Sequence, residues 1–289
     1  MMNISLRATD NINDNASTSI QKGFGNDSTP EGFILQLTYR ETTFEITFTC
    51  VILTIAFFGC IGNLATIGKI VYDPKYHKPT FAVIGQLALA DFLSVTVLTF
   101  DNMTNFSKFL PEFTVFRDIF QLSSFFHVCL LSAVRYLITV HPLQSRQHLT
   151  VKSMCLCSLT IWISSGVVII GLIYTAEAVP KIYVLTIYLI FNVLILLIVC
   201  SVVALLHVKK IRTLQNSLSV TEQSQRRMNI VVTVIISIFV LYQLFIVAGK
   251  IIFTFSDQLI GYYLIYGFVI IGSLNFSCNP YILFLSQII

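Results

Sequence analysis

Long stretches without a single Asp, Glu, Lys or Arg constrain the fold of this chain more than any other feature of its sequence. They cover residues 46–68, 119–134, 153–176, 182–208, 228–249 and 258–289, and residues 79–100 join them if one acid, Asp91, is allowed. About 20 apolar residues suffice to cross the hydrocarbon core of a bilayer. The sequence therefore predicts an all-α membrane protein, a seven-transmembrane helix bundle with approximate spans at residues 44–71, 79–101, 112–138, 151–175, 182–209, 227–250 and 257–285.

The composition agrees with a membrane location and excludes several other classes of protein. Of the 289 residues, 55% are hydrophobic and 11% are charged, whereas soluble domains carry about 25% charged residues. The net charge of +4 is too dilute for a surface that follows phosphates, so we expect a lipid bilayer and no nucleic acid as partner. Only one histidine, His127, lies well inside a span, and the seven cysteines lie within apolar stretches as small core residues. These residues form no catalytic set, so we do not expect an enzyme.

Lysine and arginine predict the orientation of the spans. If the N-terminus lies outside, most of the 18 Lys and Arg residues fall on inner loops, as the positive-inside rule requires. We therefore expect residues 1–43 to form a flexible extracellular tail, residues 44–288 to form the bundle, and the C-terminus to lie inside. Glycosylation motifs at Asn3, Asn15 and Asn26 fit an outer tail, although a tail rich in Asn and Ser can contain such motifs by composition alone.

Several spans carry a polar or otherwise unusual group, and polar groups are informative because they are costly inside a bilayer. In chain order these groups are Gly62-Asn63, Leu87-Ala88-Leu89-Ala90-Asp91, Val134-Arg135-Tyr136, the only tryptophan Trp162, and Asn275 followed by Asn279-Pro280. The set covers roughly residues 44–288 and resembles that of the rhodopsin-like (class A) G-protein-coupled receptors. The inner loops agree, with His77-Lys78-Pro79-Thr80 before the second span and Val140-His141-Pro142-Leu143 after the third.

This resemblance implies a receptor in the plasma membrane that transmits the binding of an extracellular ligand to a heterotrimeric G protein. It also implies that Arg135, Pro142 and Leu143 contact the G protein, together with the basic third inner loop. A membrane transporter is the alternative from another class. We would then expect inverted repeats with matching broken helices, and Pro280, the only proline inside a span, has no counterpart.

The resemblance further implies a sodium ion beside Asp91. Ser124, Asn275 and Asn279 complete the set of oxygen ligands, and the two asparagines lie four residues apart on one helical face. The alternative is a hydrogen-bond network of neutral Asp91 with water. No other cofactor is expected, since residues 258–289 contain no lysine for a retinal Schiff base. Pro280 is expected to kink its helix and to free a carbonyl for a neighbouring side chain.

The sequence departs from the family pattern where the family transmits its signal. Val134 replaces the acid before Arg135, Leu283 replaces a tyrosine after Pro280, and Tyr242-Gln243-Leu244-Phe245 aligns with the family's Cys-Trp-x-Pro. The chain also ends at Ile289, before the amphipathic helix that normally follows. Three interpretations remain open: a divergent receptor that signals, a receptor-like protein that does not couple, and an incomplete gene model.

Two cations near the outer ends of the spans indicate the charge of the ligand. Arg117 lies about five helical turns before Arg135 on the same face, where receptors for biogenic amines carry an aspartate, and Lys250 adds a second cation. They favour a peptide or a small anionic ligand and disfavour an amine. The alternative is structural, because Asp101 and Asp118 could neutralise Arg117. Polar and aromatic contacts to the ligand are expected from Gln121 and Tyr266, with Tyr262 and Tyr263 nearby, or the tyrosines belong to an interfacial belt.

Overall fold

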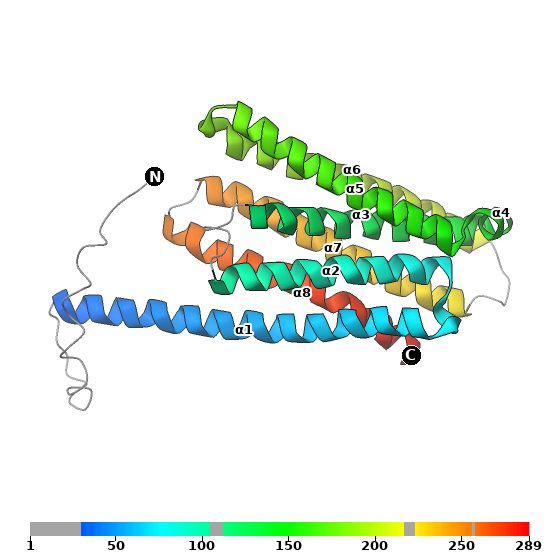
Figure 1. Ribbon diagram of the computed structural model, residues 1–289, viewed down its shortest axis with the longest axis horizontal. Coiled ribbons are helices and arrows are strands. Elements are labelled where there is room, and N and C mark those ends of the chain that lie inside the picture. Colours follow the sequence, from blue (N-terminus) through cyan, green and yellow to red (C-terminus); the bar gives the residue numbers. More distant parts are fainter. Residues whose placement is uncertain (1–29, 105–111, 217–222, 256–257, 289) are drawn as a thin grey trace. The chain divides into compact units, whose positions relative to one another are not determined.

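The computed structural model describes residues 30–104, 112–216, 223–255 and 258–288, and all regular structure in these ranges is helical. The contacts divide the chain into residues 1–46 and residues 47–289, and the second unit contains the bundle (Figure 1). Seven long helices account for the expected spans, so the predicted all-α fold is confirmed. The helices are α1 (Pro30–Tyr72), α2 (Pro79–Thr104), α3 (Glu112–Val140), α5 (Val151–Ala178), α6 (Lys181–Asn216), α7 (Gln223–Phe255) and α8 (Gln258–Ile288), with two short helices, η1 (Pro74–Tyr76) and α4 (Pro142–His148).

The helices extend beyond several of the expected spans. Helix α1 begins at Pro30, so residues 30–43, which were expected in a flexible tail, are helical. A proline suits the first turn of a helix, and no further proline interrupts the chain before Pro74. Helix α6 likewise continues to Asn216, past the predicted end at residue 209. Residues 1–29, which include Asn3, Asn15 and Asn26, lie outside the described part, and the orientation of the termini stays a prediction.

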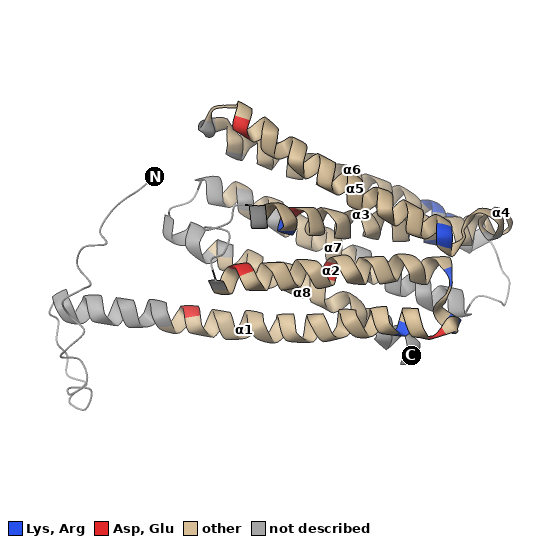
Figure 2. Ribbon diagram, viewed as in Figure 1, with Lys and Arg blue, Asp and Glu red and all other residues tan. Residues whose placement is uncertain are grey.

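The length and apolar character of the helices support the prediction that they span a membrane. Among the described residues, α1, α2, α3, α5 and α6 each contain a segment long and apolar enough to cross a bilayer, and α7 contributes the shorter segment Thr233–Gly249. Large apolar side chains such as Phe57, Ile163 and Val167 are exposed on the outside of the bundle, where acyl chains can cover them. Among the described residues, the ribbon segments of charged residues lie mostly near the helix ends (Figure 2).

Helix α3 lies at the centre of the packing. It contacts α2, α5, α6 and α7, and the α2–α3 contact is the most extensive. Because lipid tails are as apolar as leucine, close packing and polar contacts hold such helices together. The main core joins α3 to four neighbouring helices through Val83, Ile84, Leu87, Val128, Leu131, Val134, Met154, Val199, Val203, Ile235 and Phe239.

Helices α1 and α8 approach closely at two glycines. A Cβ atom on Gly59 would collide with the side chain of Ser277, and one on Gly62 would lie 3.1 Å from Pro280 Cβ. This approach brings Asn63 Nδ2 to within 3.0 Å of the carbonyl oxygen of Phe276. That carbonyl is the one Pro280 leaves without its usual helical donor. The expectation of a freed carbonyl satisfied by a neighbouring side chain is therefore confirmed.

Candidate functional site

Asp91 is fully buried in the middle of α2 and joins three helices. Ser124 Oγ on α3 donates a hydrogen bond to Asp91 Oδ1 at 2.6 Å. Asn279 Nδ2 on α8 donates to Asp91 Oδ2 at 2.7 Å. Both carboxylate oxygens therefore accept a hydrogen bond, each from a different helix. We call these three residues the Asp91 network.

The surroundings of the Asp91 network fit either a hard cation or water. Asn275 is buried, but within the described residues the structure records no hydrogen bond between it and Asp91. A cavity of about 20 Å³ adjoins the network and is lined by Asn63 and Asn279 among others, which is enough for one water. Asn63 Oδ1 is buried without a partner in the described part of the chain. Carboxylate, hydroxyl and amide oxygens suit a hard cation, so sodium stays a prediction.

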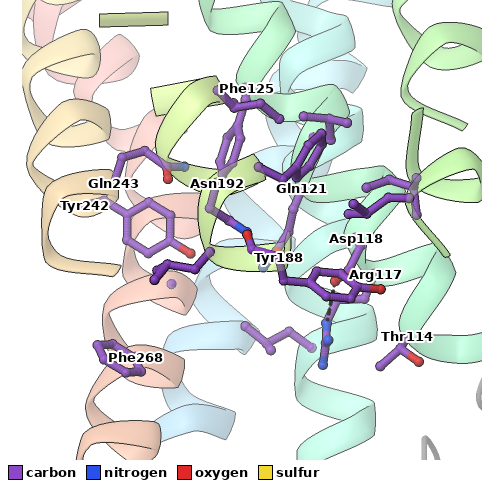
Figure 3. A pocket seen from close by; sticks show the side chains of 18 of the residues that line it. Thr114, Arg117, Asp118, Gln121, Phe125, Tyr188, Asn192, Tyr242, Gln243 and Phe268 are labelled. Carbon is purple, nitrogen blue, oxygen red and sulfur yellow. Dashed lines mark hydrogen bonds and ion pairs between the residues drawn. The ribbon is translucent and has the colours of Figure 1, made fainter. Parts of the chain in front are cut away.

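A second cavity, of about 800 Å³, lies among α2, α3, α5, α6, α7 and α8. Of the predicted ligand-binding residues, Arg117 and Gln121 line it. Tyr266 does not, since its ring packs edge-on against Phe48 with centroids 4.3 Å apart. The side chain of Lys250 lies outside the described part. Figure 3 shows the polar side chains that gather around this space, which we call the large cavity.

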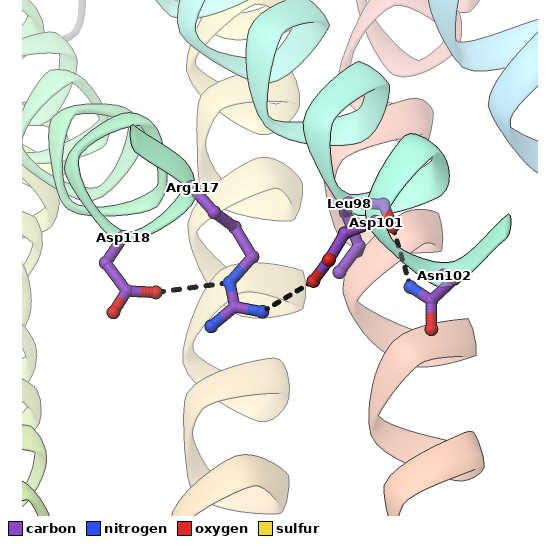
Figure 4. A network of polar contacts seen from close by, with 5 residues as sticks. All are labelled: Leu98, Asp101, Asn102, Arg117 and Asp118. Carbon is purple, nitrogen blue, oxygen red and sulfur yellow. Dashed lines mark hydrogen bonds and ion pairs between the residues drawn. The ribbon is translucent and has the colours of Figure 1, made fainter. Parts of the chain in front are cut away.

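Two acidic side chains flank Arg117, which lines the large cavity (Figure 4). Arg117 Nε lies 3.2 Å from Asp118 Oδ1, and an Nη atom of Arg117 lies 3.4 Å from Asp101 Oδ2. All three side chains are partly buried. With one guanidinium and two carboxylates, this acidic triad has a formal charge of −1. Of the two interpretations of Arg117 left open by the sequence, the geometry matches pairing.

The large cavity also contains polar residues that were not predicted as ligand contacts. Tyr188 and Asn192 of α6 and Gln243 of α7 line it, and Asn192 Nδ2 donates to the carbonyl of Tyr188 at 2.6 Å. Two polar residues four apart in an otherwise apolar span are a signal that could have identified the α6 pair. Gln243 was noted only as a departure from a family motif.

The residues expected to contact a G protein lie at the C-terminal end of α3 and at the start of α4. Val134 is 1% exposed and belongs to the main core. Arg135 Nε is buried without a partner among the described atoms. Pro142 opens α4, and Leu143, the next residue, is 80% exposed. The chain thus presents a large apolar side chain beside the end of α3, and the contact with a G protein stays a prediction.

The described part of the chain thus combines seven long helices with a cavity beside α3 and a buried polar network, an architecture that fits a multi-pass membrane protein. The family model described as 7 transmembrane receptor (rhodopsin family) matches residues 62–283. The chain belongs to this family, and it is a multi-pass membrane protein, which agrees with the plasma-membrane location expected from the sequence. Members of this family are receptors and not enzymes, as the sequence predicted.

Part of the chain is similar in sequence to trace amine-associated receptors. It is 32% identical to trace amine-associated receptor 9 of Mus musculus over 128 residues, and the matched region covers 42% of this chain and 37% of the relative. It is 34% identical over 126 residues to trace amine-associated receptor 6 of Pan troglodytes, which covers 39% of this chain and 36% of the relative. The chain therefore spans little more than a third of the length of these relatives in the matched region.

Proposed function

We propose that the protein is a receptor that binds a small extracellular molecule in the large cavity and passes the signal to a heterotrimeric G protein. The observation that carries this proposal is the position of the cavity against α3. Arg117 lines the cavity, and Arg135 lies about 27 Å further along the same helix at 1.5 Å per residue. A ligand that shifts α3 relative to α7 would change the inner surface at Arg135 and Leu143.

The acidic triad supports a ligand of the opposite charge to the one that the sequence favoured. An anionic ligand was expected on the premise that Arg117 is an unpaired cation, but Arg117 contacts both Asp101 and Asp118. A further carboxylate would have to displace one of these acids from Arg117, whereas a protonated amine could pair with Asp118, which lines the cavity and keeps some exposure. The volume of about 800 Å³ is typical of pockets for small molecules. Two relatives are named for an association with trace amines. We therefore propose a small amine in place of a peptide or anion.

A matched pair of probes tests the charge of the ligand. Phenethylamine and phenylacetate share a ring and a short chain but carry opposite charges. In cells with a promiscuous G protein and a calcium reporter, we expect the wild type to respond to the amine only. Asp118→Asn should weaken that response by about tenfold, because one carboxylate of the triad is lost.

The other outcomes each decide between stated alternatives. A response to phenylacetate alone would restore the anionic ligand that the sequence favoured. Absence of both basal and stimulated signal, at confirmed surface expression, would favour the receptor-like protein that does not couple.

The proposal includes a sodium ion in the Asp91 network that favours the resting state. Replacing external sodium by N-methylglucamine should raise basal signalling of the wild type. Asp91→Asn should remove this dependence, because the neutral amide attracts a cation far less. Asp101→Asn, which changes an acid on the same helix outside the network, is the matched control and should keep it. An unchanged sodium dependence in Asp91→Asn would contradict a sodium site at Asp91 and favour a hydrogen-bond network of Asp91 with water.

A further inference from the structure

Gln243 of α7 combines deep burial with an unused hydrogen-bond donor. Its side chain lines the large cavity, and the residue is 5% exposed. Its Nε2 atom has no hydrogen-bond partner among the residues that the structure describes. A primary amide left unpaired in a low-dielectric interior is costly. A water or a ligand can supply the missing acceptor.

Two neighbours of Gln243 make contacts of their own. Tyr242 packs edge-on against Phe276, with ring centroids 6.1 Å apart. Across the cavity, Asn192 Nδ2 donates to the carbonyl of Tyr188 at 2.6 Å, and the structure records no hydrogen bond between Asn192 and Gln243. Figure 3 shows the Gln243 amide pointing from α7 into the space shared with Asn192 and Phe125. The Gln243 side chain therefore forms part of the cavity wall, with its Nε2 atom buried there.

The level of Gln243 relative to α3 follows from a contact one turn below it. Phe239 packs edge-on against Phe125 of α3, with centroids 4.9 Å apart. One turn of α7 beyond Phe239 raises Gln243 by about 6 Å. Gln121 lies about 6 Å above Phe125 on α3 for the same reason. Gln243 is therefore near the level of Gln121, one turn deeper than the acidic triad and directly above an aromatic contact of the main core.

We propose that Gln243 Nε2 donates a hydrogen bond to an oxygen atom at the inner end of the ligand. This inference rests on the proposed function, in which the amine of the ligand lies at the acidic triad. The ligand class is then a small amine that carries an ether, carbonyl or hydroxyl oxygen at the opposite end. A ligand held in this way bridges the α3 side of the cavity and α7 just above the Phe125–Phe239 contact.

A pair of amine probes that differ only in the acceptor tests this inference. 4-Methoxyphenethylamine offers an ether oxygen at the ring position opposite the chain, and 4-ethylphenethylamine has a methylene of similar shape there. We expect the wild type to respond to the methoxy probe at about tenfold lower concentration, as one hydrogen bond to a buried donor would give. Gln243→Met keeps the length of the side chain but has no donor, so it should respond equally to both probes.

The thermal stability of the purified protein without probes supplies an independent readout. Gln243→Met should unfold at the same temperature as the wild type or higher, because the substitution removes an unpaired amide. A lower unfolding temperature would show that Gln243 is satisfied within the protein, and it would overturn the inference.

The signalling outcomes separate this inference from the proposed function. Equal potency of the two probes on the wild type would overturn the role of Gln243 and leave an amine receptor standing, with water as the partner of the amide. A probe preference that survives in Gln243→Met would assign the acceptor to another residue and also overturn it. No response of the wild type to either amine, at confirmed surface expression, would overturn the proposed function and this inference together.

Discussion

Two parts of α3 hold their polar side chains in different ways. Near the N-terminal end of the helix, Arg117 forms ion pairs with Asp101 and Asp118, and all three side chains keep some exposure. In the middle of the helix, Ser124 donates to the fully buried Asp91. The contacts of Arg117 join charged groups that water or a ligand can reach, whereas the contacts of Asp91 join a carboxyl group to neutral donors sealed among helices. We infer that the N-terminal part of α3 can exchange its partners for a ligand and that the middle cannot without loss of the bundle.

The largest effect is expected from Asp91→Leu. This change leaves Ser124 Oγ and Asn279 Nδ2 buried without their acceptor. Single hydrogen bonds between membrane helices average about 0.6 kcal/mol and reach about 1.7 kcal/mol, and bonds to an ionised acceptor are roughly twice as strong as neutral ones. We expect a loss of about 2–3 kcal/mol in the free energy of unfolding, measured in detergent or bicelles. Asp101→Leu removes an ion pair between partly exposed groups and should cost less than about 1 kcal/mol. An equally small loss for Asp91→Leu would remove the distinction between the two parts of α3.

Two adjacent serines of α3 provide a finer test of the hydrogen bond to Asp91. Ser123 and Ser124 are both buried in α3, but only Ser124 donates to Asp91, and Ser123 Oγ has no partner in the described part of the structure. Ser124→Ala should cost about 1 kcal/mol of unfolding free energy. Ser123→Ala should be neutral within about 0.5 kcal/mol, since no bond is lost. Equal costs for the two variants would contradict the hydrogen bond as the source of the stability.

Much of this arrangement follows from the sequence, and the exceptions have physical causes. Runs without charged residues identified seven helices, because a bilayer makes length and apolarity decisive. They placed the start of α1 too late, since polar residues do not end a helix when no proline or turn interrupts it. The family resemblance grouped Asp91, Ser124 and Asn279, which lie on three different helices. For Asn275, burial is all that the structure adds.

The contacts around Arg117 and the large cavity were harder to predict, because a long side chain can reach several alternative partners. The sequence allowed Arg117 to be paired or to be available to a ligand, and only the positions of Asp101 and Asp118 distinguish these states. Tyr266 was assigned to the ligand site from its place in the last span, but rotation about the helix axis directs it to Phe48. The unpaired amide of Gln243 depends on what its neighbours already bind, which no sequence pattern records.

Val134→Asp adds a carboxylate beside Arg135, near the C-terminal end of α3. The family pattern has an acid at this position, and we predict that Arg135 is less restrained without one. We expect the variant to lower basal reporter activity several-fold, which corresponds to about 1 kcal/mol of bias toward the resting state. Equal basal activity of variant and wild type, at matched surface expression, would show that Val134 does not control the restraint on Arg135. Val134→Asn adds a polar group without the charge and is the matched control for burial.

Arg117→Gln should have a small effect on stability and a clear effect on ligand response. Ion pairs between partly exposed groups contribute about 0–1 kcal/mol, so the unfolding free energy should change by less than about 1 kcal/mol. The charge of the acidic triad falls from −1 to −2, because the two carboxylates remain and the guanidinium is lost. The potency of phenethylamine should therefore rise several-fold, and phenylacetate should remain inactive. A loss of amine response in a variant that is folded and at the cell surface would mean that Arg117 orients the acids for the ligand. A gain shows instead that Arg117 competes with the amine for them.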